Sequence, residues 1–271
     1  MKGVSYYLTP DFSEISSSVI LSAIGQAFFS LAIGWGILVT YGSYLSKTEN
    51  ILEAGLWVGL ADTLVALMSG LMIFPAVFAF GKSPAQGTAL VFEVLPEVFD
   101  AIPAGGQVLG AAFFVLLAIA ALTSAISIIE VPAAYLMDEK NKSRTASTWI
   151  VTFFIFILSI PSALASGGHP FFTEMQVTLL GVTYHGFLNI IEYLFVNMVI
   201  IISSLMICLY GGWIFKTTKL IKEIDQEAGI FTKKLIGTLT FAKIWSFFIK
   251  YVCPVLILMV LIQSLFGSIT S

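Results

Sequence analysis

Six long apolar windows dominate this sequence and restrict what it can fold into. Each is close to or longer than the roughly 20 residues that an α-helix needs to cross a bilayer. Hydrophobic residues make up 58% of the 271 residues and charged residues only 11%, against roughly 25% charged in soluble domains. The windows therefore predict about six transmembrane helices, at Ser17–Leu45, Ile51–Phe80, Val108–Met137, Ala146–Ala165, Phe187–Phe215 and Trp245–Phe266.

The length and charge of the loops between these windows predict a single domain and its orientation in the membrane. No long polar linker interrupts the chain, so residues 1–271 are expected to form a single, all-α polytopic membrane domain. Lys and Arg of short loops collect on the cytoplasmic side. Of the 13 Lys and Arg, all except Lys2 and Lys82 fall on the side reached by the odd-numbered spans. We expect a multi-pass protein of the plasma membrane with both termini outside.

The first span carries a run of small residues in its middle. Gly34 and Gly36 flank Trp35, and a glycine in a helix interior costs up to about 1 kcal/mol relative to alanine. Backbone carbonyls freed at membrane depth must line a cavity, because lipid cannot satisfy them. Broken helices of this kind build solute sites in secondary transporters. Close packing of a small-residue face against a neighbouring helix is the alternative interpretation.

Hydroxyl groups line one face of the third span. Ala120, Thr123, Ser124 and Ser127 follow the spacing i, i+3, i+4 and i+7, which places them on one side of a helix. Sodium is a hard cation that prefers oxygen ligands, so this face suits a sodium site. Hydroxyls that only donate to the preceding turn of their own helix would give the same pattern.

Asp62, Glu130 and Glu192 are acidic residues that fall within spans. An ionisable group at this depth costs a few kcal/mol on insertion scales and is by default a functional hypothesis. No Lys or Arg lies near the middle of a span, so the expected partner is a cation that comes and goes, or a proton. For Glu130, a protonated packing role beside Pro132 is the alternative.

The external loop of residues 81–107 is too apolar for a simple connector. Its segment 90–99 predicts one or two short amphipathic helices, hinged near Pro96, that fold back onto the bundle as a lid. A helix lying on lipid is the alternative. His169 and His185 are expected at the surface. The sequence shows no nucleophile with its base, zinc motif or phosphate loop, which argues against an enzyme and an organic cofactor.

Several of these segments resemble one family, the neurotransmitter:sodium symporters and especially its bacterial branch. The first span reads Gly-Gln-Ala-Phe-Phe-Ser-Leu at 25–31, Gly-Trp-Gly at 34–36 and Thr-Tyr-Gly-Ser-Tyr at 40–44, which is similar to the family's sixth helix. Leu122-Thr123-Ser124, the lid loop and Asp138-Glu139 continue the likeness. It covers nearly the whole chain and implies the portion from helix six to helix eleven of a broken-helix, inverted-repeat transporter fold.

The resemblance also implies site residues. Ser30 and Asp62 would be ligands of a first sodium ion. Ala120 through its carbonyl, with the hydroxyls of Thr123 and Ser124, would contribute to a second. The residues implied as substrate-binding are Phe29, Ser30, Ala32, Trp35, Ser124 and Ile128. The residues implied as gates are Gln26 and Glu192 on the outside, and Tyr44 and Asp138 on the inside.

The implied function is sodium-coupled symport of a small amino acid by alternating access. Ala66 occupies a position where chloride-dependent members have serine, and the carboxylate of Asp62 could supply the missing negative charge, so we expect no chloride requirement. Nucleic acid is not an expected partner. Helices one to five of the family are not in this chain and are needed for activity, so the chain alone is not expected to transport. A proton-coupled transporter that uses Glu130 or Asp62, and a truncated non-transporting membrane fragment, are the alternatives.

Overall fold

The computed structural model describes residues 2–46, 48–81, 90–179, 182–224, 234–236 and 239–266. The chain divides into two compact units, and each is described by itself. The first unit comprises Met1–Ile15 and Leu56–Ser127, and the second comprises Ser16–Gly55 and Ile128–Ser271.

Five helical segments of the described chain are long and apolar enough to cross a membrane. They are Ile51–Ala79, Gly106–Lys140, Arg144–Ala165, Phe187–Ile214 and Phe241–Leu265. The remaining window is divided between two shorter helices, α2 (Ser17–Ser30) and α3 (Ile37–Tyr44). The mostly helical fold with about six spans is thus confirmed, and the predicted ends of the five long spans differ from the observed ones by a few residues.

The first unit pairs a short amino-terminal helix with a long span. Its elements are α1 (Lys2–Leu8), η1 (Phe12–Glu14), most of α4 (Ile51–Ala79), η2 (Leu90–Val94), α5 (Leu95–Asp100) and the first part of α6 (Gly106–Lys140). Tyr7 of α1 stacks on Phe74 of α4 with ring centroids 5.2 Å apart. The Tyr7 ring also lies where a Cβ on Gly70 would be, so this contact requires a glycine in α4.

The short helices predicted for residues 90–99 are present, as η2 and α5. Leu95 and Val98 of α5 are buried, and Phe99 packs on Phe113 of α6 with ring centroids 5.7 Å apart. Pro96 is the second residue of α5, directly after η2. This packing favours a segment folded onto protein over one that lies on lipid. Residues 82–89 of the predicted lid fall outside the described residues.

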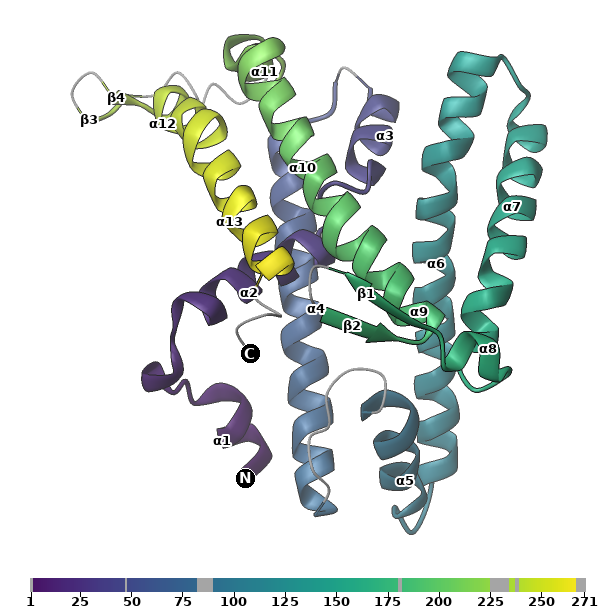
Figure 1. Cartoon of the computed structure of the whole chain (residues 1–271). Helices are drawn as coiled ribbons and strands as arrows, with labels where there is room; N and C mark the ends of the chain where they lie inside the picture. Colours follow the sequence, from purple (N-terminus) through teal and green to yellow (C-terminus); the bar gives the residue numbers. More distant parts are fainter. Residues whose placement is uncertain are drawn as a thin grey trace. The chain divides into compact units, whose positions relative to one another are not determined.

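Two spans of the second unit contain π-helical stretches. One runs through α9 (Phe187–Ile191), η3 (Glu192–Val199), α10 (Ile200–Leu209) and η4 (Tyr210–Ile214), and the other through α12 (Phe241–Phe247), η5 (Phe248–Val252) and α13 (Cys253–Phe266). Helices α10 and α13 pack side by side (Figure 1), and α2 packs on α13. Ile190, Tyr193, Ile257 and Val260 form the buried core of this group.

The loop between α7 (Arg144–Ala165) and α9 contains structure that the sequence analysis did not predict. After α8 (Pro170–Thr173), strands β1 (Gln176–Leu179) and β2 (Val182–His185) form an antiparallel hairpin, in which Val177 pairs with Tyr184. A second small sheet joins β3 (Lys234–Ile236) and β4 (Leu239–Thr240). His169 and His185 are exposed, as expected.

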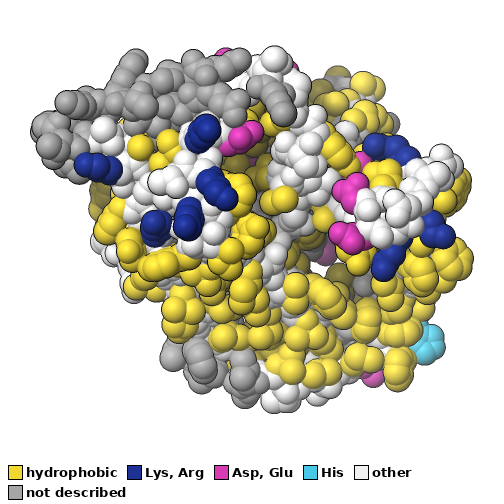
Figure 2. Space-filling model, turned by 90° about the horizontal axis from the view of Figure 1, so that it is seen from above, with side chains coloured by type: hydrophobic (Ala, Val, Ile, Leu, Met, Phe, Trp, Pro, Cys, Tyr) yellow, Lys and Arg dark blue, Asp and Glu magenta, His cyan; other side chains and the backbone are white. Residues whose placement is uncertain are grey.

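The basic residues of the second unit gather at one end of its spans. Figure 2 shows Lys and Arg in two groups, one over α11 (Thr217–Ile224) and its neighbours and one with acidic residues at the turn between α6 and α7. Lys219 lies over the ring of Phe215, with its Nζ 5.5 Å from the ring centroid. Such a basic end is typical of the cytoplasmic side of a membrane protein.

Candidate functional site

The first span is interrupted between Ser30 and Ile37, as its small residues predicted. Ala32, Gly34 and Gly36 have φ angles of 52°, 90° and 81°, and a helix cannot continue through such left-handed conformations. The N–H of Ile33 reaches back to the carbonyl of Phe28 at 3.0 Å, five residues earlier, instead of to the fourth. The backbone ladder therefore ends here and resumes only in α3.

The carbonyl of Ile33, freed by this break, meets a side chain from α10. The Ser204 hydroxyl lies 3.1 Å from the Ile33 oxygen and 2.9 Å from the oxygen of Ile200 in its own helix. The Ser204 hydroxyl therefore replaces the backbone N–H that the Ile33 carbonyl would accept from in an unbroken helix. This replacement is needed because lipid offers no donor. The sequence did not reveal Ser204, since 171 residues separate it from Ile33.

Two residues implied as substrate walls lie together across the break. The rings of Phe29 and Trp35 have centroids 6.1 Å apart and are tilted by 67°. Within the described residues, the Trp35 Nε1 is buried without a hydrogen-bond partner, which is unusual for a native indole. Ala32 lies between them in the unwound segment, and Ile128 lies on α6 in the same unit with 39% of its surface exposed.

The hydroxyl face of α6 lies in the first unit. Thr123 donates to the carbonyl of Ala120 at 2.8 Å, and Ser127 donates to the carbonyl of Thr123 at 3.2 Å. These are the bonds to the preceding turn that the alternative interpretation expected. They use the hydroxyl proton and leave oxygen lone pairs, which are what a sodium ion needs. Ala120, Thr123 and Ser124 are exposed in this unit.

The two residues implied for the first sodium ion belong to different units. Asp62, on α4, is partly buried in the first unit, and Ser30, at the end of α2, is exposed in the second. Ser124 of the implied substrate site belongs to the first unit, whereas Phe29, Ala32, Trp35 and Ile128 belong to the second. The pairing of Ser30 with Asp62 stays a prediction.

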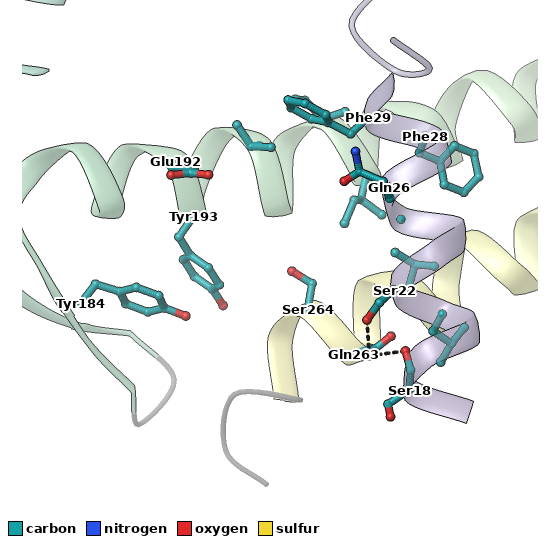
Figure 3. A pocket seen from close by; sticks show the side chains of 16 residues that line it. Ser18, Ser22, Gln26, Phe28, Phe29, Tyr184, Glu192, Tyr193, Gln263 and Ser264 are labelled. Atoms are coloured by element: carbon teal, nitrogen blue, oxygen red, sulfur yellow. Dashed lines mark hydrogen bonds between the residues drawn. The ribbon is translucent and has the colours of Figure 1, made fainter. Parts of the chain in front are cut away.

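A cavity of about 770 Å³ in the second unit contains both implied external gate residues. Gln26 from α2 and Glu192 from η3 line it together (Figure 3). Gln263 of α13 donates to the Ser18 carbonyl at 3.3 Å and lies 3.4 Å from the Ser22 hydroxyl, which ties α13 to α2. The residues that line the cavity are Ser18, Leu21, Ser22, Gly25, Gln26, Phe28, Phe29, Tyr184, Glu192, Tyr193, Val196, Ile200, Ile201, Val260, Gln263 and Ser264.

Two aromatic rings are among the side chains that line this cavity. Tyr184 from the β-hairpin stacks on Tyr193 with ring centroids 4.3 Å apart. Sequence reasoning missed both tyrosines and Gln263. A glutamine near the end of the last apolar window was a usable signal for Gln263, since polar groups within a span are costly.

Glu130 is the centre of a polar cluster that corrects one expectation. The Tyr44 hydroxyl donates to its Oε1 at 2.8 Å, and the Arg144 Nη2 donates to its Oε2 at 3.0 Å. The expectation that no basic residue neutralises the acids of the spans is wrong for Glu130, because Arg144 begins the next helix and reaches back. Tyr44 is thus bound to Glu130, while Asp138, the other residue implied at the internal gate, is exposed near the end of α6.

Comparisons with known proteins show what the chain is similar to. A sequence model of the sodium:neurotransmitter symporter family matches residues 1–270. The chain is 35% identical to an uncharacterized sodium-dependent transporter of Haemophilus influenzae, over 98% of this chain and 54% of that protein. It is 33% identical to the uncharacterized sodium-dependent transporter YhdH of Bacillus subtilis, over 97% of this chain and 55% of that protein.

A solved structure is similar over the same extent. The crystal structure of MhsT in complex with L-phenylalanine has a TM-score of 0.79 and 36% identity, and the match covers 97% of this chain and 56% of MhsT. The chain therefore spans about half the length of the relatives it matches.

Proposed function

Because the chain belongs to the sodium:neurotransmitter symporter family, we propose that it supplies part of a sodium-coupled symporter for a small amino acid that works by alternating access. The observation that carries this proposal is the unwound segment between α2 and α3, flanked by Phe29 and Trp35. A broken helix with aromatic walls provides backbone groups for the polar end of an amino acid and an apolar surface for its side chain.

The substrate we propose is an amino acid with an apolar or aromatic side chain. Phe29, Trp35 and Ile128 offer apolar surface, and Phe29 is half-exposed and free to act as a lid over a bound ligand. MhsT, 36% identical to this chain, has been crystallised with L-phenylalanine. That likeness supports an aromatic substrate here.

Two sodium ions would couple transport to the membrane potential. The proposed ligands are Ser30 and Asp62 for one ion, and Ala120, Thr123 and Ser124 for the other. Each ion that moves inward across 100 mV provides about 2.3 kcal/mol, so two ions can drive substantial accumulation. The carboxylate of Asp62 provides the negative charge that chloride provides elsewhere, and we propose that chloride is not required.

We propose that the basic end shown in Figure 2 faces the cytoplasm of the cell that makes this protein, with both termini of this chain outside its plasma membrane. In that orientation Gln26 and Glu192 line an outward cavity, while Tyr44 and Asp138 lie toward the cytoplasm and act at the internal gate.

Sodium-dependent binding of labelled L-phenylalanine tests this function. The chain would be co-expressed with the portion of MhsT that it does not match, and the co-purified complex assayed by equilibrium dialysis in sodium or potassium buffer. We expect binding only in sodium and only in the complex. A stable complex that binds no phenylalanine or other apolar amino acid in sodium would contradict the proposal.

A matched pair of amide substitutions on α4 separates the ion site from general effects. Asp62→Asn should weaken sodium-dependent binding. Glu53→Gln, in the exposed first turn of the same helix, should leave it unchanged. Equal losses in both variants would mean that Asp62 has no specific role.

A further inference from the structure

Ser204 lies in the middle of α10 and is almost fully buried, with 3% of its surface exposed. Its hydroxyl has one proton and two carbonyl acceptors within reach, Ile33 at 3.1 Å and Ile200 at 2.9 Å. A hydroxyl can donate to only one of them at a time. Donation to the residue four positions earlier, here Ile200, is a common resting state for a serine in a helix.

The backbone of the break approaches α10 closely enough for this contact only because residue 34 is glycine. A Cβ on Gly34 would lie 2.5 Å from the Ile200 oxygen and would overlap the Ser204 hydroxyl. Gly34 also has a φ of 90°, which disfavours any side chain there. The contact therefore depends on two residues that are 170 positions apart. Gly34 leaves room for the close approach, and Ser204 donates the hydrogen bond.

The contact matters because the Ile33 carbonyl has lost its helical donor. At membrane depth, a carbonyl without a donor is strongly disfavoured, since neither lipid nor apolar side chains replace water. Within the described part of the chain, the side chain of Ser204 donates a hydrogen bond to the Ile33 carbonyl. It fixes one backbone point of the segment that connects Phe29 with Trp35.

We propose that Ser204 is a positioning residue whose hydroxyl acts as a latch between α10 and the unwound segment 31–36. When it donates to Ile33, the segment is held against α10. When it rotates to Ile200, the segment is released and the hydroxyl keeps an acceptor, so release does not strand a buried donor. The effect on the substrate rests on the proposed function, whereas the latch itself is a property of this chain.

Amide hydrogen exchange of the purified 271-residue chain in lipid nanodiscs tests the latch directly. The N–H groups of Ala32, Ile33 and Trp35 are bonded within the break, and their exchange reports its opening. Loss of one hydrogen bond in Ser204→Ala should speed their exchange by about fivefold. Exchange in α13 should not change. Ser203→Ala, one position away on α10, should exchange like the wild type.

Two further variants keep the test decisive. Ser204→Thr retains the hydroxyl and should protect the segment as the wild type does. Ser204→Cys keeps the size but donates weakly, so it should speed exchange of the segment even if Ser204→Ala does not fold. Unchanged exchange of residues 31–36 in Ser204→Cys and Ser204→Ala, or an equal increase in α13, would overturn the proposal.

Substrate binding supplies a separate readout. In the complex with the remaining MhsT portion, Ser204→Ala should weaken phenylalanine binding by about fivefold, as one lost hydrogen bond would, and Ser204→Thr should restore it. Faster exchange without sodium-dependent binding in the wild type would leave the latch standing and overturn the transport function. Wild-type exchange rates in the Ser204 variants, together with sodium-dependent binding in the wild type, would overturn the latch and leave the transport function standing.

Discussion

Gly34 shows how one residue decides the course of the first span. Its φ of 90° and its lack of room for a Cβ against α10 make alanine unfavourable on two counts. We expect Gly34→Ala to lower the stability of the chain by about 1–3 kcal/mol, measured by denaturation in detergent micelles. Gly42→Ala is the matched control, because Gly42 lies inside α3 with open space at its Cβ, and should be neutral or stabilising by up to about 1 kcal/mol. Equal stability of the two variants would contradict this account.

Asp62 carries a prediction about chloride. If its carboxylate supplies the negative charge beside the first sodium ion, then replacing chloride by gluconate should not change sodium-dependent phenylalanine binding to the complex with the MhsT portion. Asp62→Asn should lower the apparent sodium affinity by about tenfold, equivalent to about 1.4 kcal/mol. An absolute chloride requirement in the wild type would exclude this role for Asp62.

Three elements of the second unit meet at Glu130. Tyr44 of α3 and Arg144 of α7 bind its two oxygens, and the Glu130 side chain is only 10% exposed whereas that of Arg144 is 67% exposed. Glu130→Ala removes both acceptors, and we expect a loss of about 2 kcal/mol in stability, less than for a fully buried pair because Arg144 can turn to solvent. Glu139→Gln, on the exposed end of the same helix, should have little effect. Denaturation midpoints that are equal for Glu130→Ala and the wild type would show that the cluster does not join these elements.

The elements were predictable from sequence to the extent that local rules determine them. Span lengths follow from hydropathy, and the break in the first span follows from Gly34 and Gly36, whose effect is local to the backbone. The partners Ser204 and Arg144 were not predictable, because which distant side chain meets a freed carbonyl or a buried acid depends on tertiary packing. The β1–β2 hairpin was missed because its strands are only four residues long and lie between much longer apolar windows. Helical spacing and the family resemblance suggested Ala120, Thr123 and Ser124 on α6 as ligands of one sodium ion. These roles, and the pairing of Ser30 with Asp62 at the other ion, remain predictions.

At the scale of the whole molecule, the orientation in the membrane can be tested with single cysteines. In a Cys208→Ser, Cys253→Ser background, Glu174→Cys lies in the loop after α7 and Lys142→Cys in the turn before it, and both positions are exposed. In intact cells, a membrane-impermeant maleimide should label Glu174→Cys but should reach Lys142→Cys only after permeabilisation. The opposite labelling would invert the proposed topology.

We propose above that this chain provides one part of a transporter that binds sodium and an amino acid together and carries both across the membrane. Uptake of labelled L-phenylalanine into proteoliposomes that contain the chain and the unmatched MhsT portion measures this most directly. An inward sodium gradient should drive accumulation, an inward proton gradient without sodium should not, and the chain alone should show neither. Proton-driven uptake without sodium, or sodium-driven uptake by the chain alone, would contradict the account.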